Sequence, residues 1–146
     1  MLSSYFIYNS VGSIDERSLS ELEMVTALGR QIRSDEKLGD RQNQESLYQY
    51  MPKFMWLLRD FTLNIEDERH NKLTPTQYLE NCLAEEGKYA HDDSKKIKKS
   101  ITNYFKEREC MTLVRPVNEE RDLQRLNTLP DFSLRAEFQQ GVKNLR

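Results

Sequence analysis

The sequence predicts an α/β fold, a partial parallel sheet of about three strands with flanking helices. Short aromatic or β-branched segments alternate along the chain with segments whose apolar residues recur at helical spacing. Residues 54–58 are continuously apolar, which is typical of a strand covered on both faces. The 146 residues suffice for one domain with a hydrophobic core. Strands joined through helices pair in parallel, by right-handed crossovers.

Three segments are predicted to form the strands. Residues 5–9 are aromatic and β-branched, and they run into a turn at Asn9-Ser10-Val11-Gly12. Residues 53–58 form the second strand and residues 110–114 the third. Arg115-Pro116 stops the third strand, because proline cannot donate to the ladder. An average sheet has roughly five or six strands, so we expect strands of a larger sheet to be missing.

Capping signals and helical periodicity predict the helices. Ser18-Leu19-Ser20-Glu21 is a capping-box pattern and predicts a helix to about Arg33. Thr74-Pro75-Thr76-Gln77 predicts a second helix, with a threonine N-cap and proline at the first position. Residues 34–50 and 62–73 lack periodicity and are predicted to be loops. The apolar positions of the other helices are Ile97, Ile101, Tyr104 and Phe105, then Leu123, Leu126 and Leu129, and finally Leu134, Phe138, Val142 and Leu145.

Charge and hydropathy limit the kinds of partner. The net charge of −2 argues against a general attraction to nucleic acid or to anionic membranes. The lysine run over residues 95–99 has Ile97 and Ile101 beneath it, so we interpret it as a solvated helix face and expect no nucleic-acid partner. No apolar run approaches the roughly 18 residues of a membrane span. Membrane association is therefore expected only through regions outside residues 1–146.

Cysteine and histidine usage predicts neither a disulfide nor a metal site. Cys82 and Cys110 are far apart and are interpreted as reduced thiols of a cytoplasmic protein. His70 and His91 lie in predicted loops, with no other ligand at zinc-binding spacing. The sequence also lacks a nucleophile–base signature such as Gly-x-Ser-x-Gly, so no catalytic residue is assigned.

Two pairs of residues follow the apolar strands and form the candidate site. Arg59-Asp60 ends the second strand, and Arg115-Pro116 ends the third. Carboxyl ends of parallel strands lie at one edge of a sheet, where open α/β folds bind ligands. The alternatives are that Arg59 and Asp60 form a surface ion pair and that Arg115 and Pro116 only terminate a strand.

Several segments occur in the order and spacing of a known family. They are Tyr8-Asn9-Ser10-Val11-Gly12-Ser13-Ile14, Phe54-Met55-Trp56-Leu57-Leu58-Arg59-Asp60-Phe61, Thr74-Pro75-Thr76-Gln77-Tyr78-Leu79-Glu80-Asn81, Tyr104-Phe105-Lys106-Glu107-Arg108-Glu109-Cys110 and Arg115-Pro116-Val117. Together they resemble the large GTPase domain of the guanylate-binding protein and atlastin group (the GB1/RHD3 type), relatives of dynamin. The resemblance implies that residues 1–146 are the C-terminal half of such a domain, the second half of a P-loop GTPase domain.

The resemblance implies a guanine nucleotide, GTP or GDP, as the ligand. Asp60 would accept hydrogen bonds from the N1–H and the N2 amino group of guanine, whereas adenine offers neither donor on that edge. Arg59 would lie near the base, and Arg115 and Pro116 would form the wall or cap of the pocket. A nucleotide-dependent homodimer of the parent protein is also implied, although Glu119 replaces an arginine that some family members carry.

The phosphate-binding motifs of this family do not occur in the sequence. A Gly-x-x-x-x-Gly-Lys-Ser loop binds phosphates through its backbone N–H groups and lysine, and its serine holds Mg²⁺. No pair among the five glycines has this spacing. Mg²⁺ binding and GTP hydrolysis are therefore expected only of a complete parent domain. The alternative is a non-catalytic, degenerate GTPase-like interaction or scaffold module.

The 146-residue chain is expected to release no phosphate from GTP above the level of buffer, because it contains no recognisable phosphate or Mg²⁺ machinery. A continuous assay of inorganic phosphate with GTP and Mg²⁺ tests this expectation, with heat-denatured chain as the control. Turnover that is lost on denaturation would contradict it.

Overall fold

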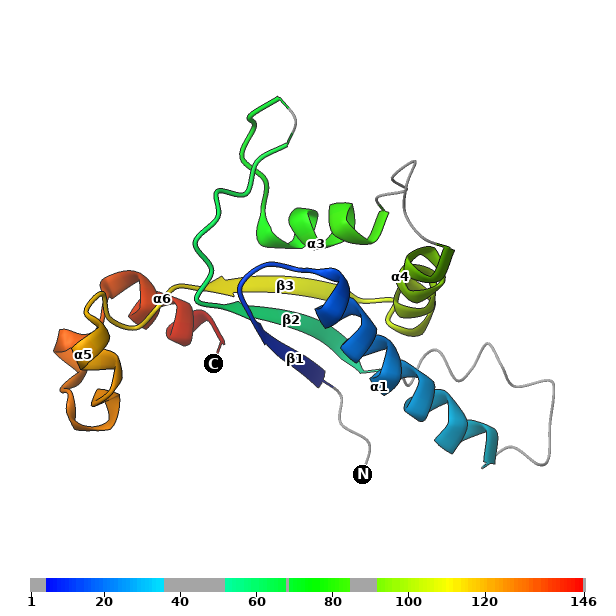
Figure 1. The fold of residues 1–146 in the computed structure, drawn as a ribbon, viewed down its shortest axis with the longest axis horizontal. Coiled ribbons are helices and arrows are strands. Elements are labelled where there is room, and N and C mark those ends of the chain that lie inside the picture. The colour runs from blue at the N-terminus through cyan, green and yellow to red at the C-terminus, as the bar shows by residue number, and fades with distance from the viewer. Residues whose placement is uncertain (1–4, 36–51, 68, 85–91, 146) are drawn as a thin grey trace.

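The computed structural model describes residues 5–35, 52–67, 69–84 and 92–145. Its strands are β1 (Tyr5–Val11), β2 (Lys53–Arg59) and β3 (Arg108–Leu113), which form one sheet (Figure 1). Its helices are α1 (Glu16–Asp35), α3 (Pro75–Ala84), α4 (Asp92–Tyr104), α5 (Glu120–Leu123) and α6 (Ala136–Leu145), with 3₁₀ turns at Leu126–Thr128 and Asp131–Ser133. The predicted α/β fold is confirmed.

The sheet is parallel, with β2 at its centre between β1 and β3. Its topology agrees with the sequence prediction, but the strand ends differ. β1 continues past the predicted turn, because the ladder extends to the pair Val11–Arg59. β3 starts earlier than predicted, because Arg108 already pairs with Phe54, and it ends at Leu113 instead of residue 114. β2 therefore has paired neighbours along its whole length.

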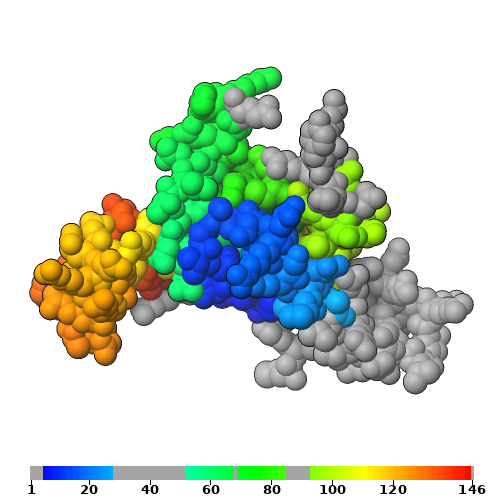
Figure 2. All heavy atoms as spheres, in the orientation of Figure 1, coloured from blue at the N-terminus to red at the C-terminus, as the bar shows by residue number. Residues whose placement is uncertain are grey.

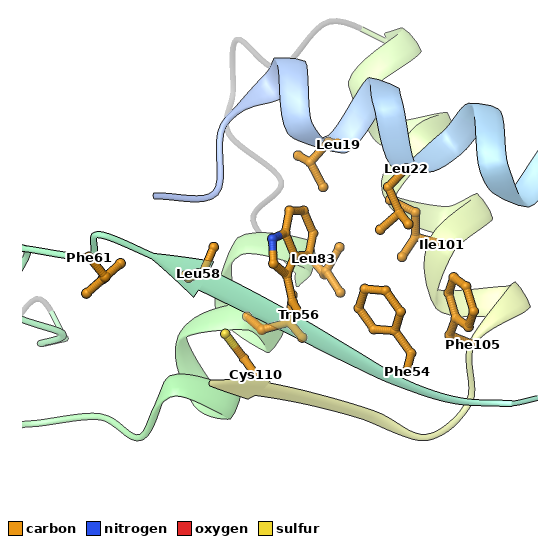
Figure 3. Packing of buried hydrophobic residues seen from close by; sticks show 11 residues of the cluster. Leu19, Leu22, Phe54, Trp56, Leu58, Phe61, Leu83, Ile101, Phe105 and Cys110 are labelled. Carbon is orange, nitrogen blue, oxygen red and sulfur yellow. The ribbon is translucent and has the colours of Figure 1, made fainter. Parts of the chain in front are cut away.

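The hydrophobic core lies between β2 and the helices α1, α3 and α4 (Figure 3). Phe54, Trp56 and Leu58 alternate along β2, face these helices and are fully buried. Phe54 stacks on Phe105 with a centroid separation of 4.5 Å. Leu57 points to the opposite face and is also buried, as predicted for a strand covered on both sides. The helices contribute Leu19, Leu22, Leu79, Leu83 and Ile101 to the core.

The opposite face of the sheet is covered unevenly. α6 lies against β3 at Gly141, where a Cβ atom would stand 2.5 Å from Leu113 Cδ1. Glycine therefore permits a close approach of this helix to the strand. Ile7 and Val11 of β1 lie on the same face and keep 46% and 61% of their surface exposed. The β3 side of this face is packed, whereas the β1 side is open among the described residues.

α1 begins earlier than the capping-box pattern predicts. Its first residue is Glu16, because Asp15 and Ser18 form a reciprocal cap. Asp15 Oδ1 accepts from the Ser18 N–H at 2.8 Å, and Ser18 Oγ accepts from the Asp15 N–H at 3.0 Å. The predicted 34–50 loop lies outside the described residues from residue 36 on, and residues 34 and 35 belong to α1.

The predicted capping box of α3 is confirmed. The Thr74 N–H donates to Gln77 Oε1 at 2.8 Å, and the Gln77 N–H donates to Thr74 Oγ1 at 3.2 Å. The loop before it, predicted over residues 62–73, contains one isolated antiparallel bridge, between Glu66 and Lys72. The predicted third helix is α4, and its lysine side is largely exposed, as expected for a solvated face.

Arg108 joins the start of β3 to α3 and to the end of α4. Its guanidinium donates to both carboxylate oxygens of Glu80, at 2.8 and 2.7 Å, and to the Phe105 carbonyl at 2.6 Å. Only 16% of the Arg108 side chain is exposed. The Lys53–Glu107 pair, at 3.0 Å, is exposed on both sides. A shielded two-pronged pair is stronger than an exposed single contact.

Replacing Arg108 by lysine is expected to lower the free energy of unfolding by about 1–3 kcal/mol, because an ammonium cannot serve these acceptors in one plane. Urea unfolding followed by the fluorescence of Trp56 measures this change. The matched control, Lys53→Met, removes only the exposed pair and is expected to leave stability unchanged. Equal losses in the two variants would contradict the expectation.

β1 has a free outer edge, because no described strand pairs with it there. An unpaired ladder beside exposed Ile7 predicts self-association of the chain as its concentration rises. We expect Ile7→Lys to reduce this association in sedimentation velocity, because a charge on an edge strand opposes pairing. Met24→Lys is the control, since Met24 is even more exposed, at 62% against 46% for Ile7, but lies on α1. A wild-type chain that stays monomeric and melts sharply would contradict the expectation.

Candidate functional site

The carboxyl ends of the three strands are linked at one edge of the sheet. The Gly12 N–H donates to the Arg59 carbonyl at 2.8 Å, and the Phe61 N–H donates to the Leu113 carbonyl at 3.3 Å. Gly12 has a φ of 79°, a left-handed conformation that suits glycine. These bonds run between the segments that leave neighbouring strands. The residues that follow β1, β2 and β3 therefore share one rim, at the left of the sheet in Figure 1.

Asp60 is the first residue after the central strand and lies in the middle of this rim. Its φ of 54° falls in the left-handed region, which residues other than glycine seldom adopt. The residue is half-buried. Its carboxylate has no hydrogen bond or ion pair with any residue that the structure describes. An unusual backbone conformation that presents free acceptors is typical of a ligand site.

Asp67, in the loop before α3, shows how a structural aspartate differs. Its Oδ1 accepts from the backbone N–H groups of Arg69 and Asn71, both at 2.8 Å. Its Oδ2 accepts from the Asn71 side chain at 2.9 Å. The hydrogen bond from the Asn71 side chain is the main cause that lowers the pKa of Asp67. Asp67 closes a loop, whereas both oxygens of Asp60 are available to a ligand.

Arg59 is not paired with Asp60. Its Nε donates to Asn9 Oδ1 at 2.6 Å, across the β1–β2 pair, and its side chain is exposed. The surface ion pair between Arg59 and Asp60, which was the alternative from sequence, is therefore not observed. The guanidinium is held by a neutral partner, and its terminal nitrogens have no hydrogen bond to a described residue.

Arg115 and Pro116 leave β3 at the same rim, and both are half-buried. The Arg135 N–H donates to the Pro116 carbonyl at 2.8 Å, and the adjacent Val117 is buried. The following residues build the lobe of α5 and the two 3₁₀ turns, which is the yellow-to-orange bulge at the left of Figure 2. β3 ends at Leu113, before this pair, so the proline does not itself stop the ladder. The pair occupies the junction between sheet and lobe.

Asn9 and Ser10 are strand residues, not the turn residues that the sequence predicts. Ser10 Oγ accepts from Trp56 Nε1 at 2.9 Å, and Asn9 holds Arg59 as described. The partners are 46 and 50 residues apart in the chain, so no local sequence pattern could reveal these contacts. They fasten β1 to β2 next to Asp60.

Outside the rim, the described residues offer few groups that could bind a ligand or a metal or act as a nucleophile. A cavity of about 630 Å³ lies between α3 and the preceding loop, but Asp60 does not line it. No cluster of three or more histidine, cysteine or acidic side chains is placed to hold a metal within the described ranges. Cys82 and Cys110 are not joined in a disulfide, and burial raises the pKa of Cys110 to about 12. Cys110 is therefore a thiol, not a nucleophilic thiolate, at neutral pH.

None of the described helices combines the length and the apolar character that a membrane crossing requires.

The fold and the rim define an α/β protein with a candidate ligand site at the carboxyl edge of a parallel sheet. The family model described as the guanylate-binding protein, N-terminal domain, matches residues 1–146, and the chain belongs to the guanylate-binding protein family. Human guanylate-binding protein 1 is 34% identical over 97% of this chain and 25% of its own length. Human guanylate-binding protein 4 is 32% identical over 94% and 22%, and the mouse guanylate-binding protein 1 is 33% identical over 97% and 24%. The chain spans about a quarter of the length of these relatives.

The comparison corrects one expectation. The family is as the sequence motifs indicate, but the placement of the chain as a C-terminal half is wrong, because the N-terminal-domain model matches all of residues 1–146. That placement combined the resemblance of the Phe54–Phe61 strand and the segments after it with the absence of a Gly-x-x-x-x-Gly-Lys-Ser loop. An absent loop marks no position along the chain, so it could not locate the segment within a domain.

Proposed function

We propose that the chain binds a guanine nucleotide, GTP or GDP, at the carboxyl edge of its sheet, with Asp60 as the residue that recognises the base. The observation that carries this proposal is the Asp60 carboxylate, which lies free at the end of the central strand in a left-handed conformation. The relatives are named guanylate-binding proteins, which supports a guanine ligand.

The chemistry of a carboxylate suits guanine. Its two oxygens accept from N1–H and from the N2 amino group, which lie side by side on the guanine edge. Adenine presents an acceptor at N1 and no amino group at C2. A desolvated carboxylate facing adenine would lose its partners, at a cost of about 1–3 kcal/mol. This difference is the physical basis of base selectivity.

The neighbouring residues take supporting roles in the proposed site. Arg59 places its guanidinium near the base, since its terminal nitrogens have no described protein partner. Arg115 and Pro116 form the base-side wall, because they leave β3 at the same rim and are tied to Arg135. Ring stacking by a guanidinium plane and contact with a rigid proline both suit a flat aromatic base.

GTP hydrolysis, Mg²⁺ binding and homodimer formation are proposed for the whole protein, not for the 146 residues. The family relatives are about four times longer than the chain, as their coverage of 25% shows. The sequence holds no Gly-x-x-x-x-Gly-Lys-Ser loop to bind the phosphates. Base recognition is thus the part of the activity that these residues can perform.

Replacing Asp60 by asparagine is expected to change the preferred base from guanine to xanthine. Xanthine keeps N1–H but has a carbonyl at C2, so the asparagine oxygen accepts from N1–H and its NH₂ group donates to that carbonyl. GDP affinity should fall about tenfold or more, and affinity for xanthosine diphosphate should rise by a similar factor. Titrations followed by ¹H–¹⁵N correlation spectra measure both, and they also detect weak binding.

Two further proteins complete this experiment. Asp93→Asn makes the same chemical change on α4 and is expected to leave both affinities at wild-type values, because Asp93 lies on an exposed helix face. The wild-type chain is expected to prefer GDP over ADP by about tenfold. Equal binding of GDP and ADP, or an Asp60→Asn variant with unchanged preference, would refute Asp60 as the base reader and favour the non-catalytic interaction module.

A further inference from the structure

We propose that Asn9 is a positioning residue of the nucleotide site, which holds the Arg59 guanidinium in its ligand-facing orientation. This inference rests on the proposed guanine-nucleotide function. The observation is the hydrogen bond from Arg59 Nε to Asn9 Oδ1, at 2.6 Å, which is the shortest contact at the rim. Neither residue forms an ion pair with a described neighbour.

The register of the sheet creates this contact. Val11 is the residue directly opposite Arg59, and Asn9 lies two positions earlier on the same face of β1. A diagonal neighbour of this kind is within reach of a long side chain. Asn9 therefore holds Arg59 from a strand, not from a loop, and its own position is set by the ladder.

The choice of nitrogen matters for the ligand. Nε lies on the inner side of the guanidinium, so a bond there fixes the plane of the group. The terminal Nη1 and Nη2 nitrogens remain without a bond to a described residue. A carboxylate partner would take two of these donors in a fork and neutralise the charge. The neutral amide of Asn9 orients the arginine while leaving its charge and its terminal donors for the nucleotide.

Holding the Arg59 side chain in place before the nucleotide binds raises the affinity of the site for the nucleotide. A free, exposed arginine loses much rotamer freedom when a ligand immobilises it, and that loss opposes binding. Asn9 restricts the side chain in the unliganded protein, so less freedom is lost later. Asn9 is therefore expected to affect nucleotide affinity only when Arg59 is present.

Local stability does not depend on Asn9 alone. Ser10 Oγ and Trp56 Nε1 form a separate bond between β1 and β2, at 2.9 Å. The Gly12 N–H holds the Arg59 carbonyl through the backbone. Removing the exposed Asn9 side chain leaves both contacts in place, so a variant at this position should fold.

The test is a double-mutant cycle of Asn9→Ala and Arg59→Gln, with GDP affinity measured by NMR titration on the full 146-residue chain. In the wild-type background, Asn9→Ala is expected to weaken GDP binding by about three- to tenfold. In the Arg59→Gln background the same change is expected to have no effect. Asn9→Asp keeps an oxygen acceptor but adds a negative charge that pairs with the Arg59 guanidinium and takes its donors, so it is also expected to weaken GDP binding.

A second measurement reports on the hydrogen bond between Arg59 and Asn9 in the absence of nucleotide. The Arg59 Nε–H resonance, assigned by its loss in Arg59→Gln, is expected to shift and broaden in Asn9→Ala. Thermal unfolding of each variant confirms that the fold is intact.

The outcomes separate this inference from the proposed function. If the wild-type chain does not bind GDP in preference to ADP, both fail together. If GDP binds with the expected preference but Asn9→Ala binds it equally well, only the role of Asn9 fails. A loss of affinity that persists in the Arg59→Gln background would also overturn it, because Asn9 would then act without Arg59.

Discussion

The burial of β2 on both faces is the constraint on which the rest of the structure depends. Phe54, Trp56 and Leu58 fill the space beneath three helices, while Leu57 packs on the other side. A slip of one residue would turn all of these side chains to the wrong face, so the packing fixes the register of the strand. That register determines where the strand stops, and hence where Asp60 stands. The polar site is positioned by apolar packing.

The two ends of the sheet are held by different chemistry. At the amino end, Arg108 bonds to Glu80 and to main-chain carbonyls in a shielded network. At the carboxyl end, neutral contacts from Ser10 and Asn9 join β1 to β2, and the charged groups of Asp60 and Arg115 have no described partner. The Arg108 charge at the amino end is paired, whereas Asp60 and Arg115 at the carboxyl end have no partner among the described residues. This asymmetry supports the carboxyl edge as the proposed binding edge.

Sequence patterns predicted the parts of the structure that depend on local chemistry. The apolar run ending at Asp60 and the Thr74–Gln77 capping box were located correctly, because their signals lie within a few residues. The start of α1 was missed, since Asp15 and Ser18 compete with the capping pattern that follows. The bond between Asn9 and Arg59 was beyond any local pattern, because it joins strands 50 residues apart. The lack of a described hydrogen-bond partner for the Asp60 carboxylate likewise could not be predicted from the sequence, because it depends on which residues the fold brings near it.

Selectivity for a base needs more than a free carboxylate. In water, a carboxylate exchanges ligand donors for solvent at little net gain, so discrimination grows as water is excluded from it. Asp60 is only half-buried. In the proposed site, water must therefore be excluded from the bound base by groups beside the rim, and we propose this role for Arg115 and Pro116, which leave β3 there. The hydrogen bond from the Arg135 N–H to the Pro116 carbonyl, at 2.8 Å, ties this segment to the residue that precedes α6. In the proposed site, Asp60 would select the base, and the Arg115–Pro116 segment would set how far water is excluded from that contact.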